Sequence, residues 1–333
     1  MGNKDVTIYD VAARAGVSIS TVSNVLNKPL RVNAATRARV LAIIDELGFV
    51  PRDAAISRAR KGIGRIGVIA PFTSYESFRR RLVGVLQEAS ERGSEVVVWD
   101  EASAAATTSP VMSSLPVKHR LDGLLIMGLP VDNTLVDRLI TTGLPTVLVD
   151  TRHPRLSSVT VDDDLGGYLV ARHLLGRGHQ HITAVREKQV SDQYVSQAQR
   201  RFAGIERALA EAGLPSSHLE QATAPGTDVS AGRAALAELW ASGRRPTAFF
   251  GHSDALAAGI VAELRASGID AVPGVAVIGY DDGPLAEAID MTSVYQPLEE
   301  SGRLATRMLY ARIASHQPVQ ETVLKPEVVV RAT

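Results

Sequence analysis

The sequence predicts two folds in one chain: an all-α helix-turn-helix module at the N-terminus and an α/β body of two doubly wound, parallel-sheet lobes. Within the first 51 residues, two short helical patterns flank a tight turn at Gly16, and a third, longer pattern follows. From Arg65 onward, apolar strand-like runs alternate with helical stretches, which is typical of parallel sheets with crossover helices. A chain of 333 residues is also too long for one hydrophobic core.

The first helix is expected to begin after Thr7, whose hydroxyl can cap it while Asp10 lies near the positive end of the helix dipole. Its apolar face carries residues at helical spacing, namely Ile8, Val11, Ala12 and Ala15. Gly16 can adopt the open backbone conformation that a sharp turn requires.

Ser18 is expected to cap the second helix, and Thr36 the third. The buried sides of these helices carry Val22, Val25, Leu26, Val40, Ile43, Ile44 and Leu47. The outer side of the second helix is small, mostly polar and uncharged, with Ile19, Ser20, Thr21, Ser23, Asn24 and Asn27. A solvated surface helix would more often carry Lys and Glu, whereas Ser, Thr and Asn suit hydrogen bonds to base edges and phosphates.

The overall charge of zero hides an asymmetry between the N-terminal module and the body. Residues 1–62 hold ten Lys and Arg against five acidic residues, and the remainder holds 26 against 31. A basic module on an acidic body is typical of DNA binding through phosphates. The chain has no cysteine, which excludes disulfides, thiolate zinc sites and thiol nucleophiles. Without an apolar signal segment or membrane-spanning run, we expect a cytoplasmic protein with no membrane partner.

Between Thr7 and Pro51 the chain contains a set of residues at specific positions: Thr7, Tyr9, Asp10-Val11-Ala12, Ala15-Gly16-Val17-Ser18, Thr21-Val22-Ser23, Leu26-Asn27, Val32, Thr36-Arg37 and Leu47-Gly48-Phe49. With this set, the stretch resembles the DNA-binding headpiece of the LacI family of bacterial repressors. The resemblance implies base contacts from Ile19, Ser20 and Asn24. It implies further DNA contacts from Thr7, Tyr9, Ser18, Thr21, Ser23, Asn27, Arg31, Thr36 and Arg37.

Residues 52–64 correspond in that family to a hinge helix, which becomes ordered on the operator and lies in the minor groove. The resemblance implies DNA contacts from Ala55 and Arg58. Arg58 stands where the family usually has an intercalating Leu. It could instead sit in a narrow minor groove, or the hinge could fail to intercalate, or the segment could be a solvated linker. The G-x-G-x-x-G match at Gly62–Gly67 is rejected as a dinucleotide site, because a strand follows the glycines instead of preceding them.

In the body, seven strands are predicted: Ile66–Ala70, Glu95–Trp99, Gly123–Met127, Thr146–Val149, His181–Val185, Ala248–Gly251 and Val275–Tyr280. Helices are predicted at Phe78–Ala89, Leu135–Ile140, Leu165–Leu175, Phe202–Ala212, Ala231–Trp240 and Leu256–Ser267, with irregular structure around Thr108–Lys118. Each half holds its own strands, so we expect two lobes with a ligand at the carboxyl ends of their strands, in the cleft between them.

This organisation resembles the periplasmic-binding-protein fold of the LacI-family core. The supporting motifs are Val161-Asp162-Asp163 with Gly166-Gly167, His173-Leu174-Leu175 with Gly178-His179, Arg201-Phe202-Ala203-Gly204, Ser253-Asp254 and Val277 to Asp282. The family's three crossings between lobes are expected near Val161, Ser293 and Val323. The expected parts are the helix-turn-helix domain (1–51), the hinge (52–64), an N-terminal lobe (65–161 with 294–322) and a C-terminal lobe (162–293 with 323–333).

By resemblance, Arg201 is the first candidate for binding effector hydroxyls, because a planar guanidinium offers paired donors. Asp281, Asp150 and Ser253 are further candidates, and the weaker ones are Gln296, Thr227, Asp228, Pro71 and Phe72. The other aspartates of these motifs, Asp162, Asp163, Asp254 and Asp282, are interpreted as caps or structural ion pairs. His173, His179 and His181 are interpreted as packing residues, because no carboxylate converges with them. No metal or cofactor is expected.

These patterns predict a DNA-binding transcriptional regulator, a repressor, whose operator affinity is set by a small molecule. The expected partners are a pseudo-palindromic operator duplex, a saccharide or sugar phosphate, and a second copy of the chain in a homodimer, with a tetramer left open. A nucleobase or another polar metabolite also fits. The alternative is a solute-binding receptor without regulatory DNA binding. An enzyme is not expected, because no catalytic constellation appears.

Overall fold

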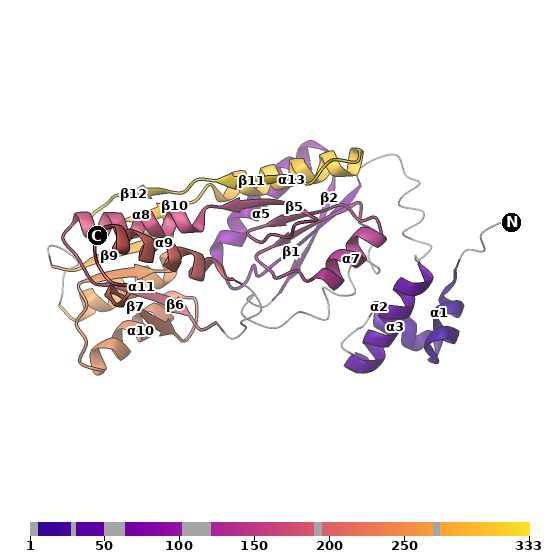
Figure 1. Cartoon of the computed structure of the whole chain (residues 1–333), viewed down its shortest axis with the longest axis horizontal. Helices are drawn as coiled ribbons and strands as arrows, with labels where there is room; N and C mark the ends of the chain where they lie inside the picture. Colours follow the sequence, from indigo (N-terminus) through magenta and orange to yellow (C-terminus); the bar gives the residue numbers. More distant parts are fainter. Residues whose placement is uncertain (1–5, 28–30, 50–63, 102–120, 190–194, 269–273) are drawn as a thin grey trace. The chain divides into compact units, whose positions relative to one another are not determined.

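The computed structural model describes residues 6–27, 31–49, 64–101, 121–189, 195–268 and 274–333 (Figure 1). The chain forms two compact units. The first comprises residues 1–73, 81–159 and 302–321, and the second comprises residues 74–80, 160–301 and 322–333. The chain therefore changes unit at five residues, Ser74, Arg81, Thr160, Gly302 and Thr322. Our three predicted crossings lie near Val161, Ser293 and Val323. No helix among the described residues is both long and apolar enough to cross a membrane.

The N-terminal module consists of three helices, α1 (Ile8–Ala15), α2 (Ile19–Asn27) and α3 (Ala34–Leu47). They share one small core, in which Val11, Val22, Val25 and Val40 are completely buried. All the apolar positions predicted for the three helices lie in this cluster or pack against it. The predicted helix-turn-helix module is therefore confirmed.

Local hydrogen bonds set the boundaries of these helices. Gly16 follows α1 with a left-handed backbone (φ 61°), which a residue with a Cβ atom rarely adopts. Ser18 Oγ accepts from the backbone N–H of Thr21 at 3.1 Å, as predicted for the cap of α2. The prediction that Thr36 caps α3 is wrong. Asn33 precedes the helix in an extended conformation, and its Oδ1 accepts from Thr36 N–H at 2.8 Å, so Thr36 lies inside the first turn.

The first sheet has the strand order β11 (Glu321–Leu324), β5 (Ser157–Val161), β4 (Thr146–Val149), β3 (Gly123–Met127), β1 (Arg65–Ala70) and β2 (Glu95–Asp100). The pairings from β5 through β4, β3 and β1 to β2 are all parallel. Helices α5 (Glu76–Glu91), α7 (Asn133–Thr141) and α13 (Leu298–Ala314) accompany these strands. A Cβ atom at Gly123 would lie 2.8 Å from Leu309 and Ile313, so α13 packs directly on β3.

The second sheet has the order β12 (Glu327–Val329), β10 (Ser293–Tyr295), β9 (Ala276–Asp281), β8 (Ala248–Gly251), β6 (Ile182–Glu187) and β7 (Leu219–Ala224). The pairings from β10 to β7 are parallel, and β12 is antiparallel to β10. Helices α8 (Asp163–Gly176) and α9 (Gln197–Glu211) contribute to one buried cluster, and α10 (Val229–Ala241) and α11 (Asp254–Ala266) to another. Phe250 and Phe249 belong to these two clusters respectively, so both faces of the sheet are covered.

The seven predicted strands and six predicted body helices are all present, with boundaries shifted by a few residues. The prediction omits β5, β7, β10, β11, β12, the short helix α12 (Pro284–Ala288) and α13. The irregular segment predicted around Thr108–Lys118 lies outside the described residues, as do Ala55 and Arg58 of the hinge.

Candidate functional site

The predicted DNA-contacting residues that the structure describes on the N-terminal module are exposed or half-buried. Tyr9 on α1 is 67% exposed and Ile19 at the start of α2 is 41% exposed. Ser20 is exposed, and Thr21, Ser23 and Asn24 are half-buried. Arg31 is exposed just before α3, and Arg37 donates from Nη1 to the carbonyl of Val32 at 3.3 Å. The side chain of Asn27 lies outside the described set.

Three hydroxyl groups form a small network at the start of α2. Ser18 Oγ lies 2.7 Å from Ser20 Oγ and 2.9 Å from Thr21 Oγ1, in addition to its bond from Thr21 N–H. On α1, the Asp10 carboxylate accepts from both the backbone N–H and the hydroxyl of Thr7, at 2.7 and 2.6 Å. These bonds hold the beginnings of α1 and α2 in a defined geometry.

In the second unit, two glycine-containing motifs bring α8 and α9 into close contact. A Cβ atom at Gly167 would overlap the carbonyl oxygen of Arg201, and one at Gly204 would overlap that of Asp164. Only glycine therefore allows this approach. The close crossing places the α9 residue Arg201 beside Asp163 at the start of α8.

Arg201 is 5% exposed and is held by several partners. Its Nε donates to Asp163 Oδ1 at 2.8 Å, and its Nη1 donates to the carbonyl of His252 at 2.8 Å. The guanidinium carbon lies 3.5 Å from the centroid of the Tyr280 ring. Burial alone would lower the pKa of Arg201, but Asp163, Tyr280 and Asp281 raise it above its ordinary value. The interpretation of Asp163 as a structural ion-pair partner agrees with this geometry.

His252 follows β8 and was not predicted as a site residue. Burial lowers the pKa of His252 well below its ordinary value, and the charges of Arg201 and Arg186 lower it further. Its Nδ1 lies 3.2 Å from Arg201 Nη1. Because a guanidinium only donates, Nδ1 acts as the acceptor here and the ring is neutral.

Asp281 ends β9 and begins a turn with an unusual backbone. Asp281 and Asp282 both have positive φ, 115° and 49°. Gln296 Nε2 donates to Asp281 Oδ1 at 2.6 Å, which joins two of the predicted effector residues directly. Arg80 Nη1 donates to the carbonyls of Asp281 and Asp282 at 2.9 and 3.2 Å. The turn is thus held in a conformation that costs energy for residues other than glycine.

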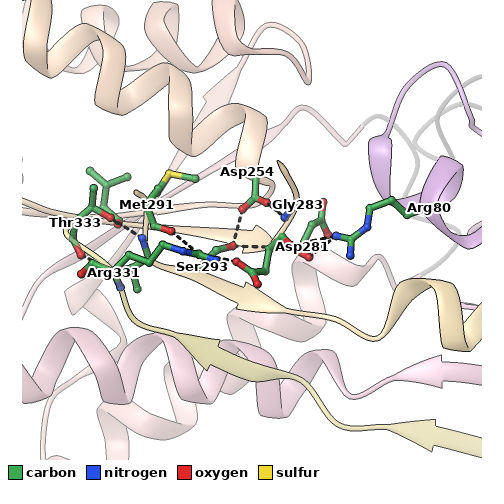
Figure 2. A network of polar contacts seen from close by, with 11 residues as sticks. Arg80, Asp254, Asp281, Gly283, Met291, Ser293, Arg331 and Thr333 are labelled. Carbon is green, nitrogen blue, oxygen red and sulfur yellow. Dashed lines mark hydrogen bonds and ion pairs between the residues drawn. The ribbon is translucent and has the colours of Figure 1, made fainter. Parts of the chain in front are cut away.

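A network behind this turn fixes it to the core of the second unit (Figure 2). Asp254 accepts from Ser293 Oγ at 2.5 Å and from the backbone N–H of Gly283 at 2.7 Å. Arg331 Nη1 donates to Asp282 Oδ1 at 2.6 Å. Figure 2 shows Arg80 and Arg331 approaching the turn from opposite sides. The interpretation of Asp254 and Asp282 as structural residues agrees with these bonds, as does that of Asp162, which caps α8.

Two carboxyl groups of the second unit have strongly perturbed pKa values. Burial raises the pKa of Asp254 to about 7, and the negative charge of Asp281 adds to this effect. Burial also raises the pKa of Glu187, at the carboxyl end of β6, to about 7. Neither carboxyl group was predicted from the sequence as part of a site. The position of Glu187 near the end of a predicted strand is the sequence feature that could have indicated it.

Ser253, Thr227 and Asp228 each make a hydrogen bond to the backbone within the described structure. Ser253 Oγ accepts from Leu256 N–H at 3.4 Å and caps α11. Asp228 Oδ1 accepts from Ala231 N–H at 2.8 Å and caps α10. Thr227 Oγ1 donates to the carbonyl of Ser74 at 2.9 Å. Each side chain therefore already has a partner within the second unit.

The remaining predicted effector residues belong to the first unit. Pro71 and Phe72 follow β1 and are buried. Asp150, after β4, is 6% exposed, has a positive φ of 56° and forms an ion pair with Arg81 of α5. Arg81 is 1% exposed and was not predicted, because an arginine in a helical pattern gives no signal that it is buried.

The histidines make packing and capping contacts. His179 Nδ1 lies 3.1 Å from Thr247 Oγ1, and the His181 ring stacks on that of His218 with centroids 4.0 Å apart. Among the described residues, no group of three or more His, Cys, Asp or Glu side chains could hold a metal ion.

Two family models match the chain. Residues 7–52 match the model described as bacterial regulatory proteins, lacI family, and residues 171–333 match that of the periplasmic binding protein-like domain. The HTH-type transcriptional repressor PurR of Vibrio parahaemolyticus is 30% identical over 334 residues, which cover 98% of each protein. The HTH-type transcriptional regulator DegA of Bacillus subtilis is 29% identical over 338 residues, covering 98% of this chain and 97% of DegA.

Solved structures of similar proteins align with nearly the whole chain. The complex of the transcriptional regulator CelR with cellobiose has a TM-score of 0.69 and 28% identity, covering 98% of this chain and 99% of CelR. The lac repressor dimer bound to operator and the anti-inducer ONPF has a TM-score of 0.69 and 26% identity, covering 98% of both chains.

Proposed function

The chain belongs to the lacI family of bacterial regulatory proteins, and from that membership we propose a repressor that binds a pseudo-palindromic operator as a homodimer and responds to a saccharide. The relative PurR is named a repressor, and the lac repressor structure is a dimer bound to operator. Bacterial operator DNA lies in the cytoplasm, and we expect the protein to act there.

The observation that carries the DNA-binding role is the outer face of α2. From Ile19 to Asn24 this face is exposed to half-buried, contains no charged side chain and begins with a fixed hydroxyl network. In a helix-turn-helix, the N-terminal residues of the second helix contact base edges in the major groove. We assign this role to Ile19, Ser20 and Asn24.

The effector role rests on the cluster around Asp281 in the second unit. The described bonds of Arg201 engage Nε and Nη1, and we assign its Nη2 as the donor to the effector. Asp281 and Gln296 supply an acceptor and an amide beside it. Sugar hydroxyls both donate and accept, so this mixed set suits a saccharide. CelR with cellobiose gives a saccharide complex of a similar protein.

DNA binding is tested by in vitro selection of duplexes on the full-length chain, followed by fluorescence anisotropy. We expect a pseudo-palindromic duplex with a Kd below about 1 μM. The affinity should be lost when residues 1–62 are deleted. Failure to enrich any sequence would contradict the proposal. That result would instead support the alternative, a solute-binding receptor that does not bind DNA.

The effector is sought by thermal shift of the full-length chain against cellobiose, ribose, glucose 6-phosphate and adenine. A compound that binds must also change operator affinity in the anisotropy assay. Asp281→Asn should abolish both responses. Asp290→Asn is the matched control, because Asp290 is exposed and also has a positive φ of 55°. Equal responses in the two variants would contradict the assignment of Asp281.

A further inference from the structure

Ile19 differs from its neighbours on the outer face of α2. It is the first residue of the helix and is 41% exposed, whereas Val22 and Val25 on the inner face are completely buried. The other outward-facing residues are serine, threonine and asparagine. Ile19 is therefore the large apolar side chain at the end of α2 that a helix-turn-helix directs toward base edges.

The hydroxyl groups beside Ile19 are already engaged with one another. Ser18 Oγ accepts from Thr21 N–H and contacts the hydroxyls of Ser20 and Thr21 at 2.7 and 2.9 Å. A serine oxygen has two lone pairs and one proton, so it accepts from one of these hydroxyls and donates to the other. Part of the hydrogen-bonding capacity at this end of the helix is thereby used within the protein.

Helix α2 also lacks the side chains that read G·C pairs best. Its sequence, Ile19 to Asn27, contains no Arg or Lys for guanine and no Asp or Glu for the amino group of cytosine. Serine and threonine can bond to either kind of base pair, asparagine favours adenine, and the thymine methyl group favours apolar contact. An exposed isoleucine at the leading end of the helix therefore matches the thymine methyl group.

We propose that Ile19 packs against the 5-methyl group of a thymine in the major groove of each operator half-site. The inference rests on the proposed operator binding and adds the base feature that α2 recognises. The surrounding module is basic, with ten Lys and Arg against five acidic residues in residues 1–62, so phosphate contacts supply affinity and Ile19 contributes selectivity.

The test replaces each thymine of one half-site of the selected operator, one at a time, with deoxyuridine, which removes only the methyl group. Binding of the full-length chain is measured by fluorescence anisotropy at fixed salt concentration. At one of these thymines, we expect the substitution to weaken binding about fourfold. This loss corresponds to the burial of one methyl group in the substituted half-site. The wild-type chain and Ile19→Ala are compared on both duplexes.

Ile19→Ala should bind the thymine duplex more weakly and be insensitive to deoxyuridine at that position. The matched control is Ile140→Ala, which truncates another exposed isoleucine, on α7 in the body, 50% exposed. This control should keep both the affinity and the deoxyuridine sensitivity of the wild type.

Two results would overturn the inference while leaving operator binding intact: wild-type affinity unchanged by deoxyuridine at every thymine, or an equal loss in Ile19→Ala and the wild type. Failure of the chain to select any duplex would instead overturn the proposed function, and the inference with it.

Discussion

The guanidinium carbon of Arg201 lies 3.5 Å from the centroid of the Tyr280 ring, while its Nε donates to Asp163 at 2.8 Å. An arginine in this position is held by a cation–π contact on one side and a buried ion pair on another. Gly166 makes room for the aromatic ring, because a Cβ atom there would overlap the Tyr280 hydroxyl. The proposed effector donor is therefore fixed before any ligand binds.

Arg201→Ala should lower the free energy of unfolding by about 3 to 5 kcal/mol, because the Asp163 carboxylate would remain buried without its partner. Urea denaturation measures this loss. The double variant Arg201→Ala with Asp163→Ala should recover much of the stability but no effector response, which separates the structural role of Arg201 from its proposed role in effector binding. A single variant as stable as the wild type would contradict the ion-pair interpretation.

Gly167→Ala should force α8 and α9 apart, because the new methyl group would overlap the carbonyl oxygen of Arg201. We expect a loss of about 3 kcal/mol, typical of strong overpacking. Gly176→Ala is the control on the same helix, since nothing lies within 4 Å of a Cβ atom there. Thermal unfolding of both variants tests the prediction, and similar melting temperatures would refute it.

The raised pKa values of Glu187 and Asp254 predict a pH dependence of stability. Burial raises the pKa of Glu187 from 4.5, and that of Asp254 from 3.8, to about 7 in each case. Between these values the folded state retains protons that the unfolded state has released. Their joint contribution to the free energy of unfolding therefore falls as pH rises from about 4 to about 7, and then levels off.

Glu187→Gln isolates one of the two carboxyls, because glutamine has the same shape but cannot ionise. Relative to the wild type, this variant should gain stability between pH 5 and pH 8, by roughly 3 kcal/mol at most, given about 1.4 kcal/mol per pKa unit. Urea denaturation at a series of pH values gives this difference directly. A difference that does not change with pH would show that Glu187 titrates normally.

Asn33→Ala should weaken the N-terminal module, because Asn33 Oδ1 accepts from Thr36 N–H at 2.8 Å and caps α3. A lost N-cap lowers helix stability by about 1 kcal/mol. Hydrogen exchange of the α3 amides in the full-length chain measures the effect. Thr36→Ala is the matched comparison and should change protection little, so a larger effect from Thr36 would support the original assignment of the cap.

The sequence predicted the fold well where hydrophobic periodicity is strong. The confirmed strands, such as Gly123–Met127, are short apolar runs that are buried along their length. Strand β5 was missed because its sequence, Ser157-Ser158-Val159-Thr160-Val161, looks polar although every residue is buried. Its Ser157 hydroxyl is bonded to Arg312 Nη1 and Gln320 N–H, at 3.0 and 3.1 Å. Such partners are distant in sequence and leave no local pattern.

The edge strands and α13 were missed for other reasons. Strands β10 and β12 have only three residues each, too few to show a period of two. The 17 residues of α13 belong to a late segment in which no helix was predicted, although Leu298, Ala305 and Leu309 on it are buried. For the candidate site, the resemblance gave Arg201, Asp281 and Gln296 as predictions. Their supporting partners, His252, Arg80 and Arg331, come from tertiary contacts alone.

The ion pair between Arg81 and Asp150 gives the last prediction. Both side chains are nearly completely buried, so removing one charge leaves the other in a medium that solvates it poorly. Arg81→Met should therefore lower the free energy of unfolding by about 3 to 5 kcal/mol. The double variant Arg81→Met with Asp150→Asn should have a stability close to that of the wild type, because it contains no unpaired charge.

If Asp150 also contacts the effector, as the resemblance implies, this stable double variant will still bind operator but will show no shift of operator affinity with the effector. Urea denaturation and the anisotropy titration together decide the point, and a normal effector response in the double variant would assign Asp150 a purely structural role.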